Sequence, residues 1–565
     1  MKITFKYEIK ESDKLDANDL TKIVLKHRNI KDIARFLSPQ TPLSISLLNY
    51  DKKYRLRLIK VIKILKEIKK NDQMIVVYTD YDADGITGGA ILWETLHFLG
   101  FKVMPYVPDR KKEGYGFSIL GIDNVIKEFN PSLIISVDNG ITKVKEVEYA
   151  KKKSIRVIIT DHHLKSDNTP KADAIFHIPE LSGSGVAYFF AKEIFNNIKS
   201  QTTQYSMLTS YFSSDYLALA SIGTIADLVP LTGSSRSVVK YGLEAFLKLK
   251  RFGIRHILKQ AGIDGKKISP YEVGFIIAPR INAVGRLKHA LDALRLLCTT
   301  NEKKAYELAH QIGNLNVERQ DLVEKSVKEA KEILNPQNSP NPKIKNRIII
   351  LTSDKWHEGI IGLIASKIAD EFYRPTIVLT KTDGHYKGSA RSILSFHITE
   401  FLRSMKKYLI DVGGHAQAAG FTIEEKKLDS FKKDIEKQAN KQIKDKDLIR
   451  IITADIKIPI SKINLEMVRS LEQLEPFGIG NPRPTFLSEV ILNDAKLFGK
   501  TNNHLKIIVS DSFERATQSL ELVGFNQGIK YKELSRGQKI KVVYTLEIDP
   551  WVGKDRLRGK INYFF

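Results

Sequence analysis

The stretch MIVVYTDYDADGITGGA, residues 74–90, places carboxylates at alternate positions directly after an apolar run. Asp80, Asp82 and Asp84 repel one another, so each costs stability unless a cation or water compensates its charge. The small residues that follow let a backbone or a phosphate come close at the start of a helix. The stretch therefore predicts a buried strand, an acidic loop that holds a cation, and a helix.

Two more apolar stretches have the same character. LIISV (133–137) and RVIIT (156–160) are short and β-branched, with apolar residues on both faces. Such strands belong in a parallel sheet that is covered on both sides. Helical patterns separate the stretches, so we expect an α/β fold with a doubly wound parallel sheet.

Each predicted strand ends in residues that can bind a metal. Asp80 follows the first strand, Asp138 follows the second, and Asp161, His162 and His163 follow the third. In open α/β sheets, ligands bind at this carboxyl edge. We therefore expect these side chains to meet at one site.

A further carboxylate and the scarcity of thiols indicate which metals the predicted site could bind. Asp227 lies in the apolar stretch SIGTIADLVPL, where an unpaired charge would be costly. Cys298 is the only cysteine, which excludes an intramolecular disulfide and a zinc site made of cysteines. Carboxylates with imidazoles suit Mn²⁺, Mg²⁺ or Zn²⁺, and such a cluster can hold two divalent ions about 3.5–4 Å apart. These ions would activate water and stabilise a phosphoryl group.

Other interpretations of the acidic loop are open when it is taken alone. It could be a solvated loop or an Asx turn. It also resembles the beginning of an EF-hand loop, but DYDADGITGGAI lacks the closing glutamate and follows a strand instead of a helix. The three strand ends together favour the metal site.

The length and the charge of the chain indicate several domains and a polyanionic partner. At 565 residues the chain is too long for one core and suggests about three or four domains. A net charge of +25 favours nucleic acid over an acidic membrane surface, with a lysine-rich compositional bias as the alternative. The N-terminus lacks the apolar stretch of a signal peptide, and no apolar run is long enough for a membrane span. We expect a cytoplasmic protein without a membrane partner.

Other segments indicate how the rest of the chain is organised. Residues 236–334 look helical, and 301–334 form a long charged stretch without proline. NPQNSPNPK (335–343) is the clearest linker, after which RIIIL opens a second α/β unit. The Gly/Pro-rich LEPFGIGNPRP (474–484) precedes short alternating segments that predict a small β-barrel.

The motifs around these residues resemble a known family. DYDADG, VDNG, TDHH and IADLVP, in this order, resemble the DHH phosphoesterase superfamily and, more narrowly, the RecJ single-strand-specific exonucleases. The resemblance covers roughly residues 70–565. Further segments similar to RecJ proteins are PRINA (279–283) with Gly285-Arg286, WHEG (356–359), SARS (389–392) and GGHAQAAG (413–420).

The resemblance implies a domain organisation. The parts would be a DHH catalytic domain (74–235), a helical connector with a long helix and a linker (236–343), a DHHA1 domain (344–445) and an oligonucleotide-binding (OB) barrel (446–565). The N-terminal region (1–73), which the resemblance hardly covers, looks mainly helical from its own residues and carries no clear function. In the barrel, aromatic residues could stack on bases, although most should be core. The candidates are Phe486, Phe498, Phe525, Tyr544 and Trp551.

The resemblance also implies roles for the residues of the first domain. The metal ligands would be Asp82, Asp84, Asp138, His162 and Asp227, holding two divalent ions, Mn²⁺ or Mg²⁺. The residues with catalytic roles that support the ligands or contact phosphate would be Asp80, Asp161 and His163.

Residues outside the first domain would bind the substrate. His357 precedes the helix-like GIIGLIASKIAD, whose start could bind a phosphate. Arg391 and a turn at Gly413, Gly414 and His415 would form a second anion site, with ordinary turns as the alternative. These groups would grip the 5′-terminal nucleotide. The residues that could face the strand, or else belong to a structural loop, are Arg280, Asn282 and Arg286.

The function implied is a metal-dependent exonuclease of single-stranded DNA. It would work from the 5′ end, release 5′-mononucleotides and serve DNA repair and recombination. We expect a monomer that cooperates with a helicase and a single-strand-binding protein. The alternatives are a DHH phosphodiesterase that cleaves short oligonucleotides or cyclic dinucleotides, and a non-catalytic replication scaffold that binds single strands.

Overall fold

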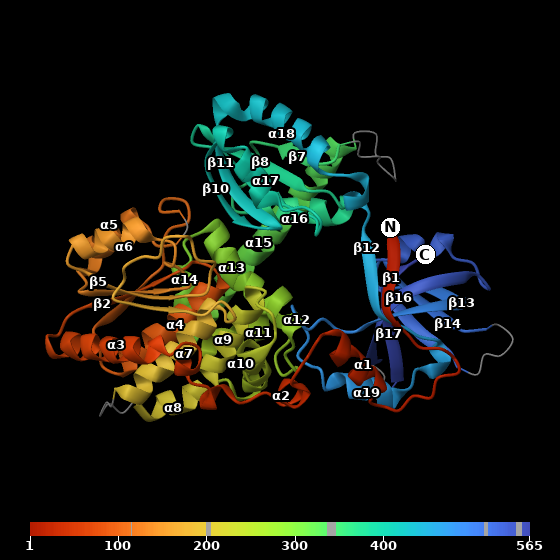
Figure 1. The fold of residues 1–565 in the computed structure, drawn as a ribbon, viewed down its shortest axis with the longest axis horizontal. Coiled ribbons are helices and arrows are strands. Elements are labelled where there is room, and N and C mark those ends of the chain that lie inside the picture. Colours follow the sequence, from red (N-terminus) through yellow and green to blue (C-terminus); the bar gives the residue numbers. More distant parts are fainter. Residues whose placement is uncertain (115, 199–204, 336–345, 513–517, 550–555) are drawn as a thin grey trace. The chain divides into compact units, whose positions relative to one another are not determined.

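The computed structural model describes residues 1–114, 116–198, 205–335, 346–512, 518–549 and 556–565. The chain divides into two compact units (Figure 1). The smaller unit comprises residues 1–2, 286–288 and 311–452, and the larger unit comprises residues 3–285, 289–310 and 453–565. None of the described helices combines the length and apolar character needed to cross a membrane.

The larger unit contains the predicted parallel sheet. Its strands lie in the order β3-β2-β4-β5-β6 and all neighbours are parallel. Helices cover both faces, which confirms the doubly wound fold (Figure 1). The strands are β2 (Ile75–Thr79), β3 (Val103–Tyr106), β4 (Leu133–Val137), β5 (Arg156–Asp161) and β6 (Ala174–His177). The helices are α4 (Ala83–Phe98) and α7 (Gly183–Asn197) on one face, with α5 (Ile119–Phe129) and α6 (Val144–Lys152) on the other.

The strand order sets the position of the ligand site. The chain leaves β2 towards β3 on one side and returns to β4 on the other. Loops at such a switch point diverge and leave a crevice at the carboxyl ends of the strands. Asp80 and Asp138 follow the two strands that flank this crevice.

The helical pattern predicted over residues 236–334 is present. The predicted linker over 335–343 lies outside the described residues except for residue 335. Two helices precede this part, α8 (Tyr205–Ser213) and α9 (Asp215–Ala226). The helices of the part itself are α10 (Gly233–Ala245), α11 (Phe252–Gln260), α12 (Pro270–Glu272), the π-helix η4 (Val273–Ile277), α13 (Ala278–Leu287), α14 (Leu291–Cys298) and α15 (Glu302–Leu334).

The smaller unit is the second α/β unit. Its sheet has the order β10-β11-β9-β8-β7, in which only β7 and β8 are parallel within the described pairings. Separate apolar cores lie against α15 and α16 and against α17 and α18. The elements are β7 (Ile349–Thr352), α16 (Ile361–Phe372), β8 (Thr376–Thr382), β9 (His385–Arg391), α17 (Ile398–Ser404), β10 (Leu409–His415), β11 (Ala418–Glu424) and α18 (Leu428–Gln442).

The predicted barrel is closed. Its strands follow the order β13-β14-β15-β17-β16, and β16 pairs back with β13. Strand β12 continues this sheet beside β13, with α19 packed on the barrel core. The elements are β12 (Ile451–Lys457), α19 (Leu465–Glu472), β13 (Thr485–Phe498), β14 (His504–Ser510), β15 (Leu520–Gly524), β16 (Lys539–Asp549) and β17 (Arg556–Phe564).

The N-terminal region differs from the helical prediction at its beginning. Residues 2–8 form strand β1, which lies next to β12 in the barrel sheet. Its sequence KITFKYE alternates apolar and polar residues, the period of a half-buried strand. Helices follow as predicted, and they are α1 (Asp19–His27), α2 (Ile33–Leu37) and α3 (Lys53–Lys70).

Candidate active site

The acidic loop is organised by the start of α4. Asp82 is the N-cap, and its Oδ1 accepts hydrogen bonds from the N–H groups of Asp84 (3.0 Å) and Gly85 (3.1 Å). Asp80 Oδ1 accepts from Tyr81 N at 2.7 Å. Asp84 accepts from backbone N–H groups at the start of α7, at 2.6 and 2.9 Å. Helix-start N–H groups thus stabilise carboxylates that would otherwise only repel one another.

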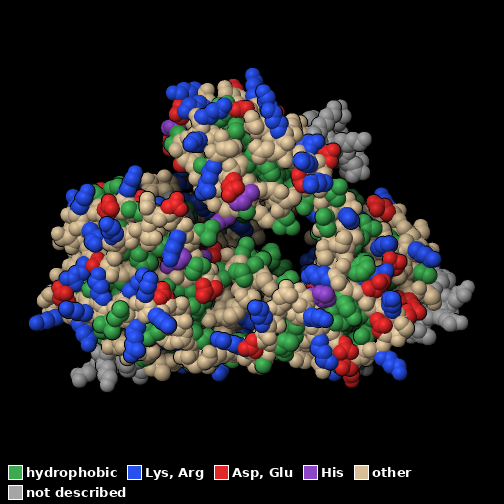
Figure 2. All heavy atoms as spheres, in the orientation of Figure 1, with side chains coloured by type: hydrophobic (Ala, Val, Ile, Leu, Met, Phe, Trp, Pro, Cys, Tyr) green, Lys and Arg blue, Asp and Glu red, His purple; other side chains and the backbone are tan. Residues whose placement is uncertain are grey.

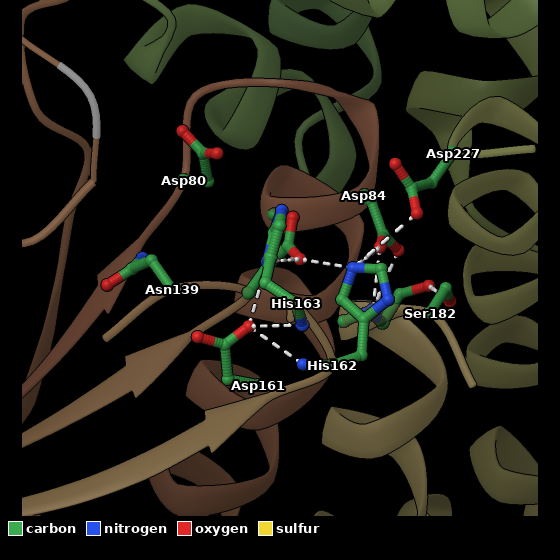
Figure 3. Close-up of polar contacts among 12 residues, drawn as sticks. Asp80, Asp84, Asn139, Asp161, His162, His163, Ser182 and Asp227 are labelled. Atoms are coloured by element: carbon green, nitrogen blue, oxygen red, sulfur yellow. Dashed lines mark hydrogen bonds and ion pairs between the residues drawn. The ribbon is translucent and has the colours of Figure 1, made fainter. Parts of the chain in front are cut away.

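The loops after β4 and β5 bring the other predicted ligands to the same place. Asp138 is buried and has a φ of 64°, a left-handed conformation that Asp tolerates better than most residues. Asp161 Oδ1 accepts from the backbone N–H groups of His162 (2.7 Å) and His163 (3.1 Å) and lies 2.8 Å from His163 Nδ1. Asp161 therefore fixes both histidines, as Figure 3 shows.

His162 is the centre of the cluster. Its Nε2 lies 3.1 Å from Asp138 Oδ1, 3.5 Å from Asp227 Oδ2 and 3.8 Å from Asp84 Oδ2 (Figure 3). Asp227 comes from the end of α9, so helices and strand ends contribute together. Three sets of residues have ligand atoms within 4.8 Å of one another, namely Asp138 with His162 and His163, Asp84 with His162 and Asp227, and Asp80 with Asp82 and Asp138.

The chemistry of the cluster fits divalent cations. Burial, and then the charges of Asp84 and Asp82, raise the pKa of Asp138 well above its usual range and that of Asp227 to about 8. Asp138 Oδ1 and His162 Nε2 are buried, and neither makes a hydrogen bond to a described residue. Clustered carboxylates that repel one another, with an oxygen of Asp138 and a nitrogen of His162 left without a hydrogen bond to a described residue, are what a dication would bind.

Two glycines that the sequence interpretation missed allow this close packing. A Cβ at Gly183 would lie 2.4 Å from the Asp138 side chain, and one at Gly223 would lie 2.3 Å from Asp84 Oδ1. Both helices can therefore approach the carboxylates only with glycine at these positions. The SGSG run at residues 182–185 was the available signal for a close approach.

The smaller unit brings several of the predicted substrate groups together. His357 Nδ1 accepts from Gly359 N at 3.0 Å, and Arg286 donates to Gly359 O at 3.1 Å. The Arg391 guanidinium lies at the first turn of α16, where a Cβ at Gly362 would be 3.1 Å from its Nη2. Arg391 is partly buried, which lowers its pKa, and its Nη1 donates to Ala390 O at 2.8 Å.

The predicted glycine turn is wrong. Gly413, Gly414 and His415 belong to the exposed strand β10, which is paired with β11. The turn is instead formed by residues 416–417, because antiparallel strands need only a short connection. In the register, Ala418 pairs with both His415 and Arg391, so that His415 and Arg391 share one row of the sheet.

The remaining candidates are dispersed. Arg280 donates to Ile276 O at 2.8 Å, and Asn282 Oδ1 accepts from Ala83 N at 2.7 Å, both within the larger unit. In the barrel, Phe486 and Tyr544 are core residues, whereas Phe525 is 44% exposed. Phe498 and His504 lie beside Phe525, with ring centroids 5.1–6.2 Å apart. Trp551 lies outside the described residues.

Basic side chains do not gather at one place on the face that Figure 2 draws. Figure 2 shows Lys and Arg side chains spread over the visible face of each unit instead of in one patch. The net charge of +25 therefore supports a polyanionic ligand in general. The position of the binding site has to be inferred from individual residues instead of from the overall charge.

Comparisons with known proteins agree with these features. Family models match residues 74–224 (DHH family, N-terminal domain), 345–441 (DHHA1 domain) and 454–563 (RecJ OB domain). A single-stranded-DNA-specific exonuclease RecJ of Haemophilus influenzae is 30% identical over 95% of this chain and 94% of its own length. Its counterpart in Bacillus subtilis is 35% identical over 86% of this chain, which spans 60% of that relative. The structure of Thermus thermophilus RecJ in complex with Mn²⁺ has a TM-score of 0.80 and 26% identity, and the match covers 100% of this chain and 80% of that one.

Proposed function

The chain belongs to the RecJ family, and we propose that it is a metal-dependent exonuclease that degrades single-stranded DNA from its 5′ end and releases 5′-mononucleotides. The observation that carries the proposal is the buried cluster of Asp and His ligand atoms at the carboxyl edge of the sheet. The names of the relatives support the substrate.

We assign the metal ligands as Asp82, Asp84, Asp138, His162 and Asp227, holding two ions of Mn²⁺ or Mg²⁺. When bound, the ions supply a hydroxide nucleophile and neutralise the scissile phosphate. The rest of the chemistry belongs to the protein. Asp161 holds the two histidines, and His163 faces the cluster as a phosphate contact, while Asp80 supports the loop.

The preference for the 5′ end of the strand would come from residues of the smaller unit. Arg391 and the start of α16 would bind a terminal phosphate, through a partly buried guanidinium and the positive end of the helix dipole. His357, Gly413, Gly414 and His415 would complete this site, with Arg280 and Arg286 along the strand. The exposed Phe525 and the partly buried Phe498 are the barrel residues that would stack on bases, since Phe486 and Tyr544 are core.

The domain boundaries proposed are those of the sequence interpretation, 1–73, 74–235, 236–343, 344–445 and 446–565. We also propose a cytoplasmic monomer that acts in repair and recombination with a helicase and a single-strand-binding protein. The barrel supports a long single strand over a dinucleotide as substrate. The complete set of ligands supports an enzyme over a scaffold.

Digestion of oligonucleotides labelled at the 5′ or the 3′ end tests the proposal. Single and double strands are incubated with Mn²⁺, Mg²⁺ or EDTA, beside the Asp82→Ala and Asp138→Ala proteins. We expect mononucleotides from the 5′ end of single strands only, and none with EDTA or either variant. Cleavage of dinucleotides alone, or binding of single strands without cleavage, would replace the proposal by one of the two alternatives.

A further inference from the structure

Asn282 makes a long-range hydrogen bond to the acidic loop. Its Oδ1 accepts from Ala83 N at 2.7 Å, across 199 positions of sequence. Ala83 is the first residue of α4 and lies between Asp82 and Asp84. The first N–H groups of a helix have no partner within it. Asp82 accepts from the next two N–H groups, so Asn282 completes the cap of this helix.

A second contact holds the same loop from the same helix. Gly285 lies three positions after Asn282 on α13, hence on the same face. A Cβ at Gly285 would lie 2.8 Å from Tyr81 O, so the α13 backbone packs directly against the loop. Residues 81–83 are therefore clamped by one helix turn, through a side-chain acceptor and a close backbone contact.

The helix that forms the clamp has an irregular beginning. The π-helix η4 (Val273–Ile277) leads directly into α13. A π-helical turn holds an extra residue and shifts the facing of all residues after it, and such turns are frequently found at functional sites. Ile281, Ala283 and Val284 are buried, which fixes α13 in the orientation that points Asn282 at the loop.

We propose that Asn282 is a positioning residue for the metal-binding loop, and that it does not contact the DNA as the sequence interpretation expected. By fixing Ala83 it sets the direction of the first turn of α4. Asp82 uses Oδ1 for the cap, so a fixed loop leaves its second oxygen directed at a cation. The inference rests on the proposed function in taking that cation to be Mn²⁺ or Mg²⁺.

The test is direct titration of the full-length, metal-free protein with Mn²⁺, followed by calorimetry or by the EPR signal of free Mn²⁺. Loss of a group that supports metal ligands typically lowers metal affinity by about 10- to 100-fold. We expect that loss in Asn282→Ala. Asn282→Asp keeps the acceptor oxygen and should bind Mn²⁺ as tightly as the unmodified protein or more tightly. The KM for a single-stranded oligonucleotide should be unchanged in both variants at saturating Mn²⁺.

Asn301→Ala is the matched control. Asn301 Oδ1 accepts from Lys304 N at 2.9 Å at the start of α15, so the same kind of cap is lost away from the cluster. Its melting temperature should fall by a similar amount, and its Mn²⁺ affinity should not change. The comparison separates general helix stability from positioning of the ligands.

Three results would overturn the inference. Normal Mn²⁺ affinity with a raised KM in Asn282→Ala would make Asn282 a substrate contact. Equal loss of affinity in the Ala and Asp variants would show that the acceptor oxygen is irrelevant. Normal affinity with only a lower melting temperature would make it an ordinary cap. Failure of the proposed function is distinct, because the unmodified protein would then bind no Mn²⁺.

Discussion

Replacing Asp161 by asparagine should weaken the contacts that hold His162 and His163 at the end of β5. The Asp161 carboxylate accepts on Oδ1 from the backbone N–H groups of His162 and His163 and on Oδ2 from Ile141 N at 2.8 Å. Asparagine has the same shape but only one acceptor oxygen. Its NH₂ group must therefore face an N–H donor on one side or the other.

The magnitude follows from the pKa of His163. Burial alone would lower this pKa, but the hydrogen bond and charge of Asp161 outweigh burial, with help from Asp227 and Asp80, and raise it from 6.5 to about 9. Such a rise corresponds to about 3 kcal/mol in favour of the protonated form. Because other carboxylates share the effect, we expect Asp161→Asn to lower the free energy of unfolding of the metal-free protein by about 1.5–3 kcal/mol.

The fall in the free energy of unfolding caused by Asp161→Asn should depend on pH. The folded-state pKa of His163 is raised, so its contribution is complete below pH 6.5 and disappears as the pH rises through about 9. The pKa of Asp161 is lowered despite burial, mainly by the hydrogen bond from His163, so its contribution disappears as the pH falls below 3.8. The difference between Asp161→Asn and the unmodified protein should be largest between about pH 4 and 6.5.

Two measurements check this reasoning. NMR titration of the His163 ring in the metal-free protein should show a pKa well below 9 in Asp161→Asn. Urea unfolding at a series of pH values should show the largest difference in the free energy of unfolding between about pH 4 and 6.5. Asp32→Asn, at the exposed N-cap of α2, is the control and should change neither quantity. A His163 pKa that stays near 9 in Asp161→Asn would refute the assignment of Asp161 as the partner that charges it.

Three further substitutions test other parts of the structure. Gly223→Ala would press a Cβ onto Asp84, so we expect about 1–3 kcal/mol of destabilisation and weaker Mn²⁺ binding; unchanged calorimetric titration would contradict the packing argument. Arg391→Ala should raise KM more for oligonucleotides with a 5′-phosphate than for those with a 5′-hydroxyl, measured by initial rates, and an equal effect on both would exclude a phosphate site. Phe525→Ala should weaken the binding of single strands by about 1–3 kcal/mol, measured by fluorescence anisotropy, without unfolding the barrel. Phe486→Ala should instead lower the free energy of unfolding, by about 3–5 kcal/mol in urea. Full affinity in Phe525→Ala would show that Phe525 does not stack on bases.

Features of the sequence that depend on near neighbours were predictable. The β-branched runs before Asp80, Asp138 and Asp161 identify buried strands, and a parallel sheet necessarily brings their ends to one edge. The acidic loop after β2 was predicted for the same reason. The N-terminal strand was missed although KITFKYE alternates apolar and polar residues, because so short a segment forms a strand only where it can pair, and its partner β12 is distant in the sequence.

Contacts between distant segments were not predictable. Nothing near Asn282 indicates that its partner is Ala83, since the hydrogen bond depends on the path of the intervening helices. The SGSG run around Gly183 signals a close approach without naming the partner, and Gly223 has no such signal; only the position of the carboxylates shows why no Cβ fits at either glycine. The Gly413-Gly414 pair suggested a turn by composition, but pairing with β11 overrides that local preference.

The pairing of β1 with β12 has a consequence for the way the chain is made. The hydroxyls of Thr4 and Thr453 lie 2.9 Å apart although 449 positions separate them. At ribosomal speeds of about 5–20 residues per second, the first strand emerges roughly 20–90 s before its partner exists. During that interval it is a free strand edge, and Lys2 and Lys6 give it the charges that discourage pairing with other chains. The outer strand of the barrel sheet can therefore pair only after residues that follow it by 449 positions have been synthesised.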